Sequence, residues 1–374
     1  MIEESDPGRV RVKIPGDHDR NTALDLLRGA AILVVIGLHW SNSHLPAPPD
    51  TAWDRAFNGF AGHGGYGVEM FFVLSGFLIT RAAMQRQGGL FGISIRDFYL
   101  RRCARIQPLY IAAVCFGLVL VFAVPIGSAI YHYTFRDPAA VYGGEFIASL
   151  FSFSYNWEMI AHRHEFQFRG LHWDVMWSLA IEEQFYLAFP LLILWARNRR
   201  RLTIALIAVA VAGLAARVAA DATHAGLLMK FNSFSGFGNI ALGVLCALWR
   251  DALRLSAAVS NGLIVAGTAV IAAACFHGGV APIILGAVLF VIGAGETLLF
   301  RHRLWRVPAR IGQLSYGLYL LQAGALLLAA PILGGQNLVA GFLILAATAY
   351  VMAEISSRCF EAPINNWARA RLRR

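Results

Sequence analysis

The chain has 374 residues, of which 57% are hydrophobic and only 14% are charged, and its mean hydropathy is +0.57. Soluble domains have about 45–50% apolar and about 25% charged residues, so the composition excludes an ordinary soluble enzyme and indicates an integral membrane protein. The net charge of +10 would also suit a nucleic-acid binder, but in membrane proteins an excess of Lys and Arg follows more often from helix orientation. We therefore expect the lipid bilayer, and no nucleic acid, as a partner.

The sequence predicts an all-α fold, a polytopic transmembrane helix bundle of about ten spans, since a span needs about 20 mostly apolar residues. Stretches of this kind lie at 23–42, 66–84, 108–130, 174–196, 202–221, 231–250, 255–276, 280–300, 312–333 and 337–357. The polar residues 1–20 are expected to form a flexible cytoplasmic tail. Residues 21–365 would form one membrane domain, and residues 366–374 a basic cytoplasmic tail.

The distribution of basic residues orients these spans. If the N-terminus is cytoplasmic, nearly all Lys and Arg residues fall in cytoplasmic segments, including the run RNRRR at 197–201. The exceptions are Arg55, Arg136, Arg163, Arg169 and Lys230 in outer loops, and Arg217 within a span. This is the positive-inside pattern, and it places both termini in the cytoplasm. An eleventh span at 142–160 would move the RNRRR run outside, so we expect that stretch to be an outer-surface or re-entrant helix.

The first span contains the stretch LRGAAILVVIGLHW (27–40), which carries Arg28 near one end and His39 near the other. Thr22 is the expected N-cap of this helix. The eleven residues from Arg28 to His39 turn a helix by about 1100° and rise about 16 Å, so both side chains share one face at different depths. They can contact two parts of one long ligand, but not each other. The alternative is that Arg28 pairs with Asp25 and that His39 is an interfacial histidine.

The second span, in GYGVEMFFVLSGFLI (65–79), carries Glu69 in its outer part. This carboxylate could hold the Nδ1 proton of His39 and make the imidazole a better base, or it could be an exposed residue at the helix mouth. Deeper in the same span, Ser75 and Gly76 favour a close helix-packing site over a nucleophile.

The span within HWDVMWSLAIEEQFYLAFP (172–190) places Glu182, Glu183 and Gln184 near mid-bilayer. A carboxylate there costs several kcal/mol, so at least one should face a polar cavity or a basic partner. A structural ion pair and a role in a site remain equally open.

The stretch RRCARIQPLY (101–110) precedes the third span on the cytoplasmic side. Arg102 and Arg105 share a helical face and could clamp phosphates, although the same pattern is typical of cytoplasmic anchoring. The five cysteines form no CxxC pair, so we expect neither a disulfide framework nor a metal site.

Six stretches, taken together and in this order, resemble the membrane acyltransferase-3 family. They are the Arg28–His39 pair, GVEMFFVLSGFLI (67–79), the RxxR of Arg102 and Arg105 with IQPLY (106–110), WSLAIEEQFYL (177–187), LSYGLYLLQ (314–322) and FEAPI (360–364). The resemblance covers residues 20–365 and implies a ten-helix domain in a bacterial cytoplasmic (inner) membrane. It departs from the family at Glu69, where Asp is usual, and at Gln322, where the motif often ends in His.

The resemblance implies an O-acyltransferase that moves an acyl group, often acetyl, from cytoplasmic acyl-CoA to a hydroxyl of a glycan, a glycolipid or a small acceptor. His39 would be the essential histidine and take the proton of the acceptor hydroxyl, with Glu69 and Glu183 as the other catalytic residues. Arg28, Arg102 and Arg105 would bind acyl-CoA, and no metal is expected. The alternative is a transporter or flippase of a glycan precursor that uses the buried charges as a relay. A non-catalytic subunit of a glycan-export complex is the third possibility.

Overall fold

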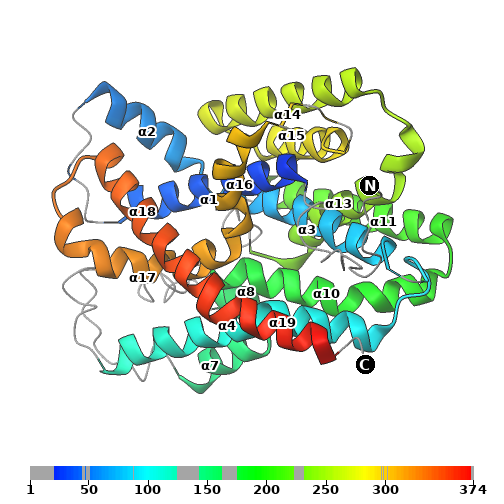
Figure 1. Cartoon of the computed structure of the whole chain (residues 1–374), viewed down its shortest axis with the longest axis horizontal. Coiled ribbons are helices and arrows are strands. Elements are labelled where there is room, and N and C mark those ends of the chain that lie inside the picture. Colours follow the sequence, from blue (N-terminus) through cyan, green and yellow to red (C-terminus); the bar gives the residue numbers. More distant parts are fainter. Residues whose placement is uncertain are drawn as a thin grey trace, which may run out of the picture.

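The computed structural model describes residues 21–43, 47, 51–86, 88–123, 143–161, 175–222, 231–295, 297, 299–300 and 302–371. These residues form helices joined by short connections, and no strand occurs among them. Most of the long helices run side by side, roughly along the horizontal direction of Figure 1. The predicted all-helical bundle is therefore confirmed.

The helices follow one another along the chain with these bounds: α1 (Thr22–Ser41), α2 (Ala52–Gly62), α3 (Tyr66–Met84), α4 (Ile95–Ala123), α7 (Gly144–Phe151), α8 (Tyr155–Ala161), α10 (Met176–Ala196), α11 (Arg199–Ala222), α13 (Ser233–Trp249), η1 (Arg250–Leu253), α14 (Ala257–His277), α15 (Val280–Gly293), η2 (Arg303–Trp305), α16 (Arg306–Gln313), α17 (Ser315–Leu333), α18 (Leu338–Ser356), η3 (Ser357–Glu361) and α19 (Ala362–Arg371). Within these residues, 8 helices are long and apolar enough to cross a membrane. This finding, together with the composition, identifies a multi-pass membrane protein.

Each of the ten predicted spans coincides with a helix, but not every helix has the predicted length. α13 has 17 residues and α15 has 14, both shorter than the eight long helices. α4 begins at Ile95 rather than at 108, and the predicted end of its span at 130 lies outside the described residues. The number of spans and the cytoplasmic placement of the termini stay predictions.

The stretch at 142–160 is not a single span. From Gly143 onward it forms α7 and α8, helices of 8 and 7 residues, separated by Phe153 with a positive φ of 55°. Neither helix can cross a bilayer core, which needs about 20 helical residues. The interpretation of this stretch as something other than an eleventh span is therefore confirmed.

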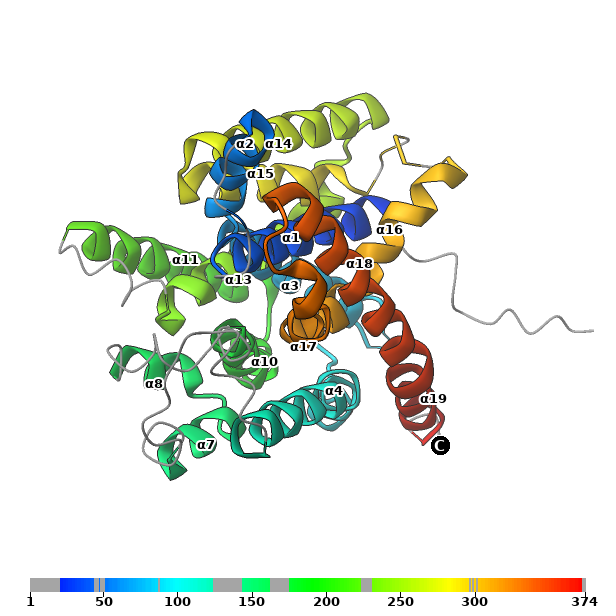
Figure 2. The ribbon, with the colours of Figure 1, turned by 90° about the vertical axis from the view of Figure 1, so that its left-hand side faces the viewer.

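The central helices are α1, α3 and α17, around which the others are arranged (Figure 2). The most apolar window of α3 is 67% buried, whereas that of α11 is only 17% buried. The exposed side chains of α11 are largely apolar, among them Ile204, Val211 and Leu214. In a bilayer such an apolar outer face contacts lipid, so burial separates the central helices from the lipid-facing ones.

Glycines allow a close contact between helices where α3 crosses α13. A Cβ added to Gly76 would overlap the carbonyl oxygen of Ile240, and one added to Gly243 would overlap that of Val73. Small residues let helix backbones approach in this way. The predicted packing role of Gly76 is confirmed.

The N-cap of the first helix lies one residue earlier than predicted. Asn21 is the N-cap, and its side chain accepts a hydrogen bond from the Leu24 backbone N–H at 3.2 Å. Thr22 is the first residue inside the helix, so the prediction of Thr22 as the cap was wrong. Asn is at least as good an N-cap as Thr, because its side-chain oxygen reaches the same orphan amide.

Candidate active site

A cavity of about 140 Å³ lies among α1, α3, α4, α10 and α17. Its polar lining includes three arginines and two glutamates that were singled out in the sequence. The lining consists of Arg28, Val68, Phe71, Leu74, Ser75, Leu78, Ala82, Arg102, Arg105, Ile106, Ser178, Leu179, Glu182, Glu183, Tyr186, Ser315, Tyr316 and Tyr319. Residues from five motifs that are distant in sequence therefore surround one space.

Arg28 reaches this cavity from the first turns of α1. Its Nη2 donates to Ser315 Oγ on α17 at 2.9 Å, and its Nη1 lies 3.8 Å from Asp25 Oδ1 one turn earlier. The expected Arg28–Asp25 pair is thus present, and it coexists with the position of Arg28 in the cavity wall. The two interpretations of Arg28 are not exclusive.

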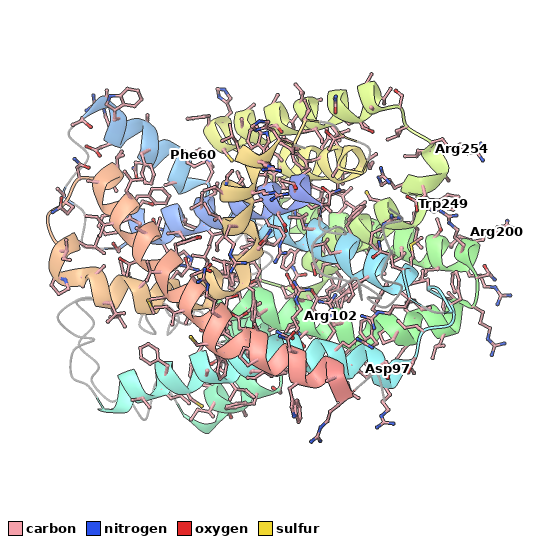
Figure 3. All side chains as sticks on the ribbon, in the orientation of Figure 1. Phe60, Asp97, Arg102, Arg200, Trp249 and Arg254 are labelled. Carbon is pink, nitrogen blue, oxygen red and sulfur yellow. The ribbon has the colours of Figure 1, made fainter. Side chains whose placement is uncertain are left out.

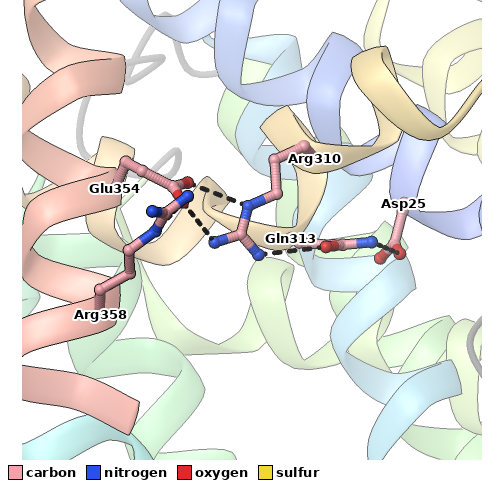
Figure 4. Close-up of polar contacts among 5 residues, drawn as sticks. All are labelled: Asp25, Arg310, Gln313, Glu354 and Arg358. Atoms are coloured by element: carbon pink, nitrogen blue, oxygen red, sulfur yellow. Dashed lines mark hydrogen bonds and ion pairs between the residues drawn. The ribbon is translucent and has the colours of Figure 1, made fainter. Parts of the chain in front are cut away.

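Asp25 is itself part of a chain of polar contacts that joins α1, α16 and α18 (Figure 4). Gln313 Nε2 donates to Asp25 Oδ2 at 3.1 Å, and Arg310 Nη1 donates to Gln313 Oε1 at 3.3 Å. Arg310 also makes two hydrogen bonds of 3.0 Å to Glu354, which accepts a further one from Arg358 at 2.6 Å. This chain holds the helix that carries Arg28 against two neighbours.

The three polar residues in the middle of α10 have different environments. Glu182 accepts hydrogen bonds from Tyr186 Oη at 2.6 Å and from Ser75 Oγ at 3.4 Å, and Ser75 also contacts Tyr186. Glu183 is 8% exposed; its Oε2 accepts from Gln107 Nε2 at 3.5 Å, while its Oε1 is buried without a partner in the described part of the chain. Both glutamates face the cavity, as at least one was expected to do.

Gln184, the third of these residues, ties α10 to α8 and α13. Its Nε2 donates to Phe153 O at 2.6 Å and to Asn156 Oδ1 at 2.9 Å, and its Oε1 accepts from Ser233 Oγ at 2.5 Å. Asn156 donates in turn to Ser233 Oγ at 3.1 Å. This closed set of hydrogen bonds fixes the short helices against the bundle and has a structural role.

Arg102 and Arg105 lie on the same face of α4, as predicted, and both line the cavity. The Arg102 guanidinium stacks on the Tyr186 ring, with Cζ at 4.5 Å from the ring centroid. In Figure 3, Arg102 lies where α4 approaches α10, whereas Arg200 and Arg254 project from the end of the molecule. Arg102 is partly buried and Arg105 is exposed, so the pair extends from the interior to the surface.

A second, larger cavity of about 520 Å³ adjoins the first. It is built from the end of α3, the segment before α4, the start of α4 and helix α19. Its lining consists of Ile79, Ala82, Ala83, Arg86, Gly89, Gly92, Ile93, Ser94, Asp97, Phe98, Arg101, Arg102, Ala104, Arg105, Asn365 and Ala368. The two cavities share Ala82, Arg102 and Arg105, so the RxxR pair belongs to the walls of both.

His39 and Glu69 line neither of these two cavities. His39 is partly buried in the last turn of α1 and lines neither cavity. Gly67 packs against Ala31 and Val35, while Gly64 packs against Val34 and Leu38, so α3 runs antiparallel to α1. Glu69 follows Gly67 by two residues, about 200° around the helix, so its side chain lies on the side of α3 that faces away from α1.

The Glu69 carboxylate has two other partners. Arg217 Nη2 on α11 donates to Glu69 Oε1 at 2.8 Å, and the Asn239 amide on α13 donates to Oε2. These contacts form a buried polar group that joins α3, α11 and α13. The role of Glu69 in orienting His39 stays a prediction.

Several side chains at the site were not singled out from the sequence. Tyr186, Ser178 and Tyr319 line the cavity, and Ser178 Oγ and Tyr319 Oη are 2.6 Å apart. Ser75, expected only to pack, also lines the cavity. Tyr186 follows Glu182 by four residues and so lies on the same helical face, a signal that the sequence did contain.

Comparisons with known proteins show to which family the chain belongs. The family model described as an acyltransferase domain matches residues 21–354. Peptidoglycan O-acetyltransferase OatA of Listeria monocytogenes is 29% identical over 91% of this chain and 55% of its own length. O-acetyltransferase OatA of Staphylococcus aureus (strain NCTC 8325 / PS 47) is 29% identical over 80% of this chain and 53% of its own length.

A shorter match is to the putative peptidoglycan O-acetyltransferase YrhL of Bacillus subtilis, 33% identical over 46% of this chain and 24% of that protein. The chain thus spans about half the length of the two OatA relatives. No solved structure matches it. The family match covers most of the chain and includes the residues of the cavity, and the chain therefore belongs to the acyltransferase-3 family.

Proposed function

We propose that the protein is a membrane-embedded O-acyltransferase that moves an acyl group, in the first instance acetyl, from cytoplasmic acyl-CoA to a hydroxyl of an acceptor. The observation that carries this proposal is the convergence of Arg28, Arg102, Arg105 and Glu183 on one cavity inside the bundle. Charged side chains inside a membrane domain mark functional sites by default. Family membership supports acyl transfer as the reaction.

The donor would enter at the RxxR end of the bundle. Arg105 and Arg102 would bind its phosphates, because guanidinium groups form charge-assisted hydrogen bonds with phosphate. Arg28, held by Ser315 and Asp25, would contact the donor farther inside. The thioester arm would then extend along the face of α1 toward His39.

His39 would act as the general base at the other end of that face. Its imidazole would take the proton of the acceptor hydroxyl while the hydroxyl oxygen attacks the thioester carbonyl carbon. The carbon–sulfur bond would break, and CoA would leave as the thiol after protonation. Glu183 would balance the arginines along the path, and Glu69 would support His39 only indirectly, by holding α3 to α11 and α13.

The acceptor class follows from the named relatives. Two of those cited are peptidoglycan O-acetyltransferases by name, so we propose a glycan acceptor, reached from the outer face of a bacterial cytoplasmic membrane. A glycolipid or a small hydroxylated acceptor has the same reacting group. The transporter alternative is not supported by these similarities.

The test is the O-acyl content of lipid, glycan and secreted fractions from cells that express the intact chain, His39→Ala or His277→Ala. His277 is an exposed histidine in the last turn of α14 and serves as the matched control. We expect one fraction to gain acyl groups with the intact chain and with His277→Ala, but not with His39→Ala. Equal acyl content in cells with the intact chain and with His39→Ala, at equal amounts of membrane protein, would contradict the proposal.

A further inference from the structure

Two buried polar atoms in the walls of the two cavities have no hydrogen-bond partner in the described part of the chain. They are Nε of Arg101 and Oε1 of Glu183. Buried polar groups are paired in the great majority of cases, and an unpaired one costs about 1–3 kcal/mol. Each of these atoms therefore points to a group outside the described residues, and at a cavity wall a bound ligand can supply it.

The two atoms differ in chemistry and in location. The Arg101 Nε–H can only donate, and it belongs to the larger cavity, which is also lined by Arg86, Arg102 and Arg105. An ionised carboxylate only accepts, and Glu183 belongs to the smaller cavity. Because the cavities share Arg102 and Arg105, an unpaired donor in the larger cavity and an unpaired acceptor in the smaller one lie on either side of the RxxR pair.

This order matches one class of acyl donor. A phosphopantetheine thioester carries phosphates, which accept hydrogen bonds, and then an arm whose hydroxyl and amide N–H groups donate them. We propose that Arg101 binds a phosphate of the donor in the larger cavity and that Glu183 accepts a hydrogen bond from an amide N–H of the pantetheine arm. The inference rests on the proposed acyl-CoA donor and assigns to Arg101 and Glu183 specific roles in recognising it.

The sizes of the cavities agree with this assignment. The larger cavity, at about 520 Å³, has room for the phosphate-bearing end of the donor, and Asn365 and Ala368 of α19 form part of its wall. The smaller cavity, at about 140 Å³, suits an extended pantetheine arm. An acyl phosphate has no N–H to offer and carries a negative charge, so Glu183 would select against it.

The test measures ligand binding to the purified full chain in lipid nanodiscs. The ligands are coenzyme A and its nucleotide half. The nucleotide half is ADP with the additional ribose phosphate, and it lacks the pantetheine arm. Hydrogen bonds to charged groups contribute about 1.5–3 kcal/mol, and tenfold in affinity corresponds to about 1.4 kcal/mol. Glu183→Gln should therefore weaken the binding of coenzyme A about tenfold and leave the binding of the nucleotide half unchanged. Arg101→Gln should weaken the binding of both ligands by a similar factor.

The controls are Arg200→Gln and Glu145→Gln, the same chemical changes at exposed side chains; neither should change binding. Unchanged binding of the nucleotide half also shows that Glu183→Gln is folded. The inference is wrong if Glu183→Gln weakens the binding of both ligands equally or of neither. It is also wrong if Arg101→Gln leaves the binding of the nucleotide half unchanged. In both cases the proposed acyl transfer can still hold. If the intact chain binds neither ligand, the proposed donor is wrong as well.

Discussion

The buried pair of Glu69 and Arg217 should tolerate the loss of both charges better than the loss of one. Arg217 Nη2 lies 2.8 Å from Glu69 Oε1, and the Glu69 side chain is only 5% exposed. Arg217→Met would remove the cation and leave the carboxylate buried, with the Asn239 amide still bound to it. Combining this change with Glu69→Gln would remove both charges.

Removing one partner of a buried ion pair costs about 3–5 kcal/mol, because the other charge stays uncompensated. We expect the lower end for Arg217→Met, about 3 kcal/mol, since the Asn239 amide still donates to the carboxylate and desolvation of the pair is incomplete. Replacing both charges by neutral groups is often close to neutral for stability. The double variant should therefore recover most of the loss.

The assay is thermal unfolding of the purified chain in detergent. For a chain of 374 residues, a loss of about 3 kcal/mol should lower the apparent melting midpoint by roughly 4 °C. Arg200→Met, at an exposed position on the same helix, is the control and should leave the midpoint unchanged. A midpoint for Arg217→Met equal to that of the intact chain, or one for the double variant no higher than for Arg217→Met, would refute the reasoning.

The same double variant separates the two roles considered for Glu69. If Glu69 oriented His39, a stable double variant would lose acyl transfer. Because the contacts of Glu69 are to Arg217 and Asn239, we expect the double variant to retain most of its acyl transfer once its stability is restored.

Three further outcomes are expected. Arg102→Ala should raise the KM for acyl-CoA about tenfold or more and change kcat at saturating donor little, because a hydrogen bond to a charged phosphate contributes about 1.5–3 kcal/mol. Arg200→Ala is the control, and a loss confined to kcat would contradict a phosphate role for Arg102. Gly76→Leu should lower the free energy of unfolding by about 3 kcal/mol through overpacking of α3 against α13. Its melting midpoint should lie below that of Gly262→Leu, because a Cβ added at Gly262 meets nothing within 4 Å. Equal midpoints for the two variants would contradict the close crossing of α3 and α13. Gln184→Ala should lower the free energy of unfolding by about 1–3 kcal/mol, because it leaves buried polar groups unpaired. It should also speed proteolysis within residues 143–161, whereas Gln85→Ala, at an exposed position, should not. Equal cleavage rates for the two variants would contradict the role of Gln184 in holding α8 against α10.

The helical bundle was predictable because a bilayer allows few alternatives. Lipid cannot satisfy backbone polar groups, so long apolar stretches must be helical, and each predicted stretch does coincide with a helix. The start of α4 was not predictable in the same way. The arginines at 101–105 lower the hydropathy, so the apolar stretch begins at 108, but a helix continues through basic residues wherever a polar cavity receives them.

The site was predictable where it depends on spacing within one helix, and not where it depends on which helices touch. Arg102 and Arg105 were assigned to one face from their separation of three residues, and both line the cavity. Arg28 was assigned to one face of α1 together with His39, but of these two only Arg28 lines it. The partner of Glu69 lies 148 residues away on α11, and no local pattern identifies that helix as the neighbour of α3. Ser75 looked like a packing residue because its neighbour Gly76 is one, and the cavity beside it arises only when α10 is placed.

The most direct measurement of the central claim uses the purified chain in lipid vesicles with acetyl-CoA and glycan fragments as the acceptor. Release of the CoA thiol and formation of O-acetyl groups on the glycan are followed together. The proposed function predicts equal molar amounts of both products, lost in His39→Ala and kept in His277→Ala. Movement of glycan across the vesicle membrane with no thiol release and no O-acetyl product would contradict it and would favour a transporter.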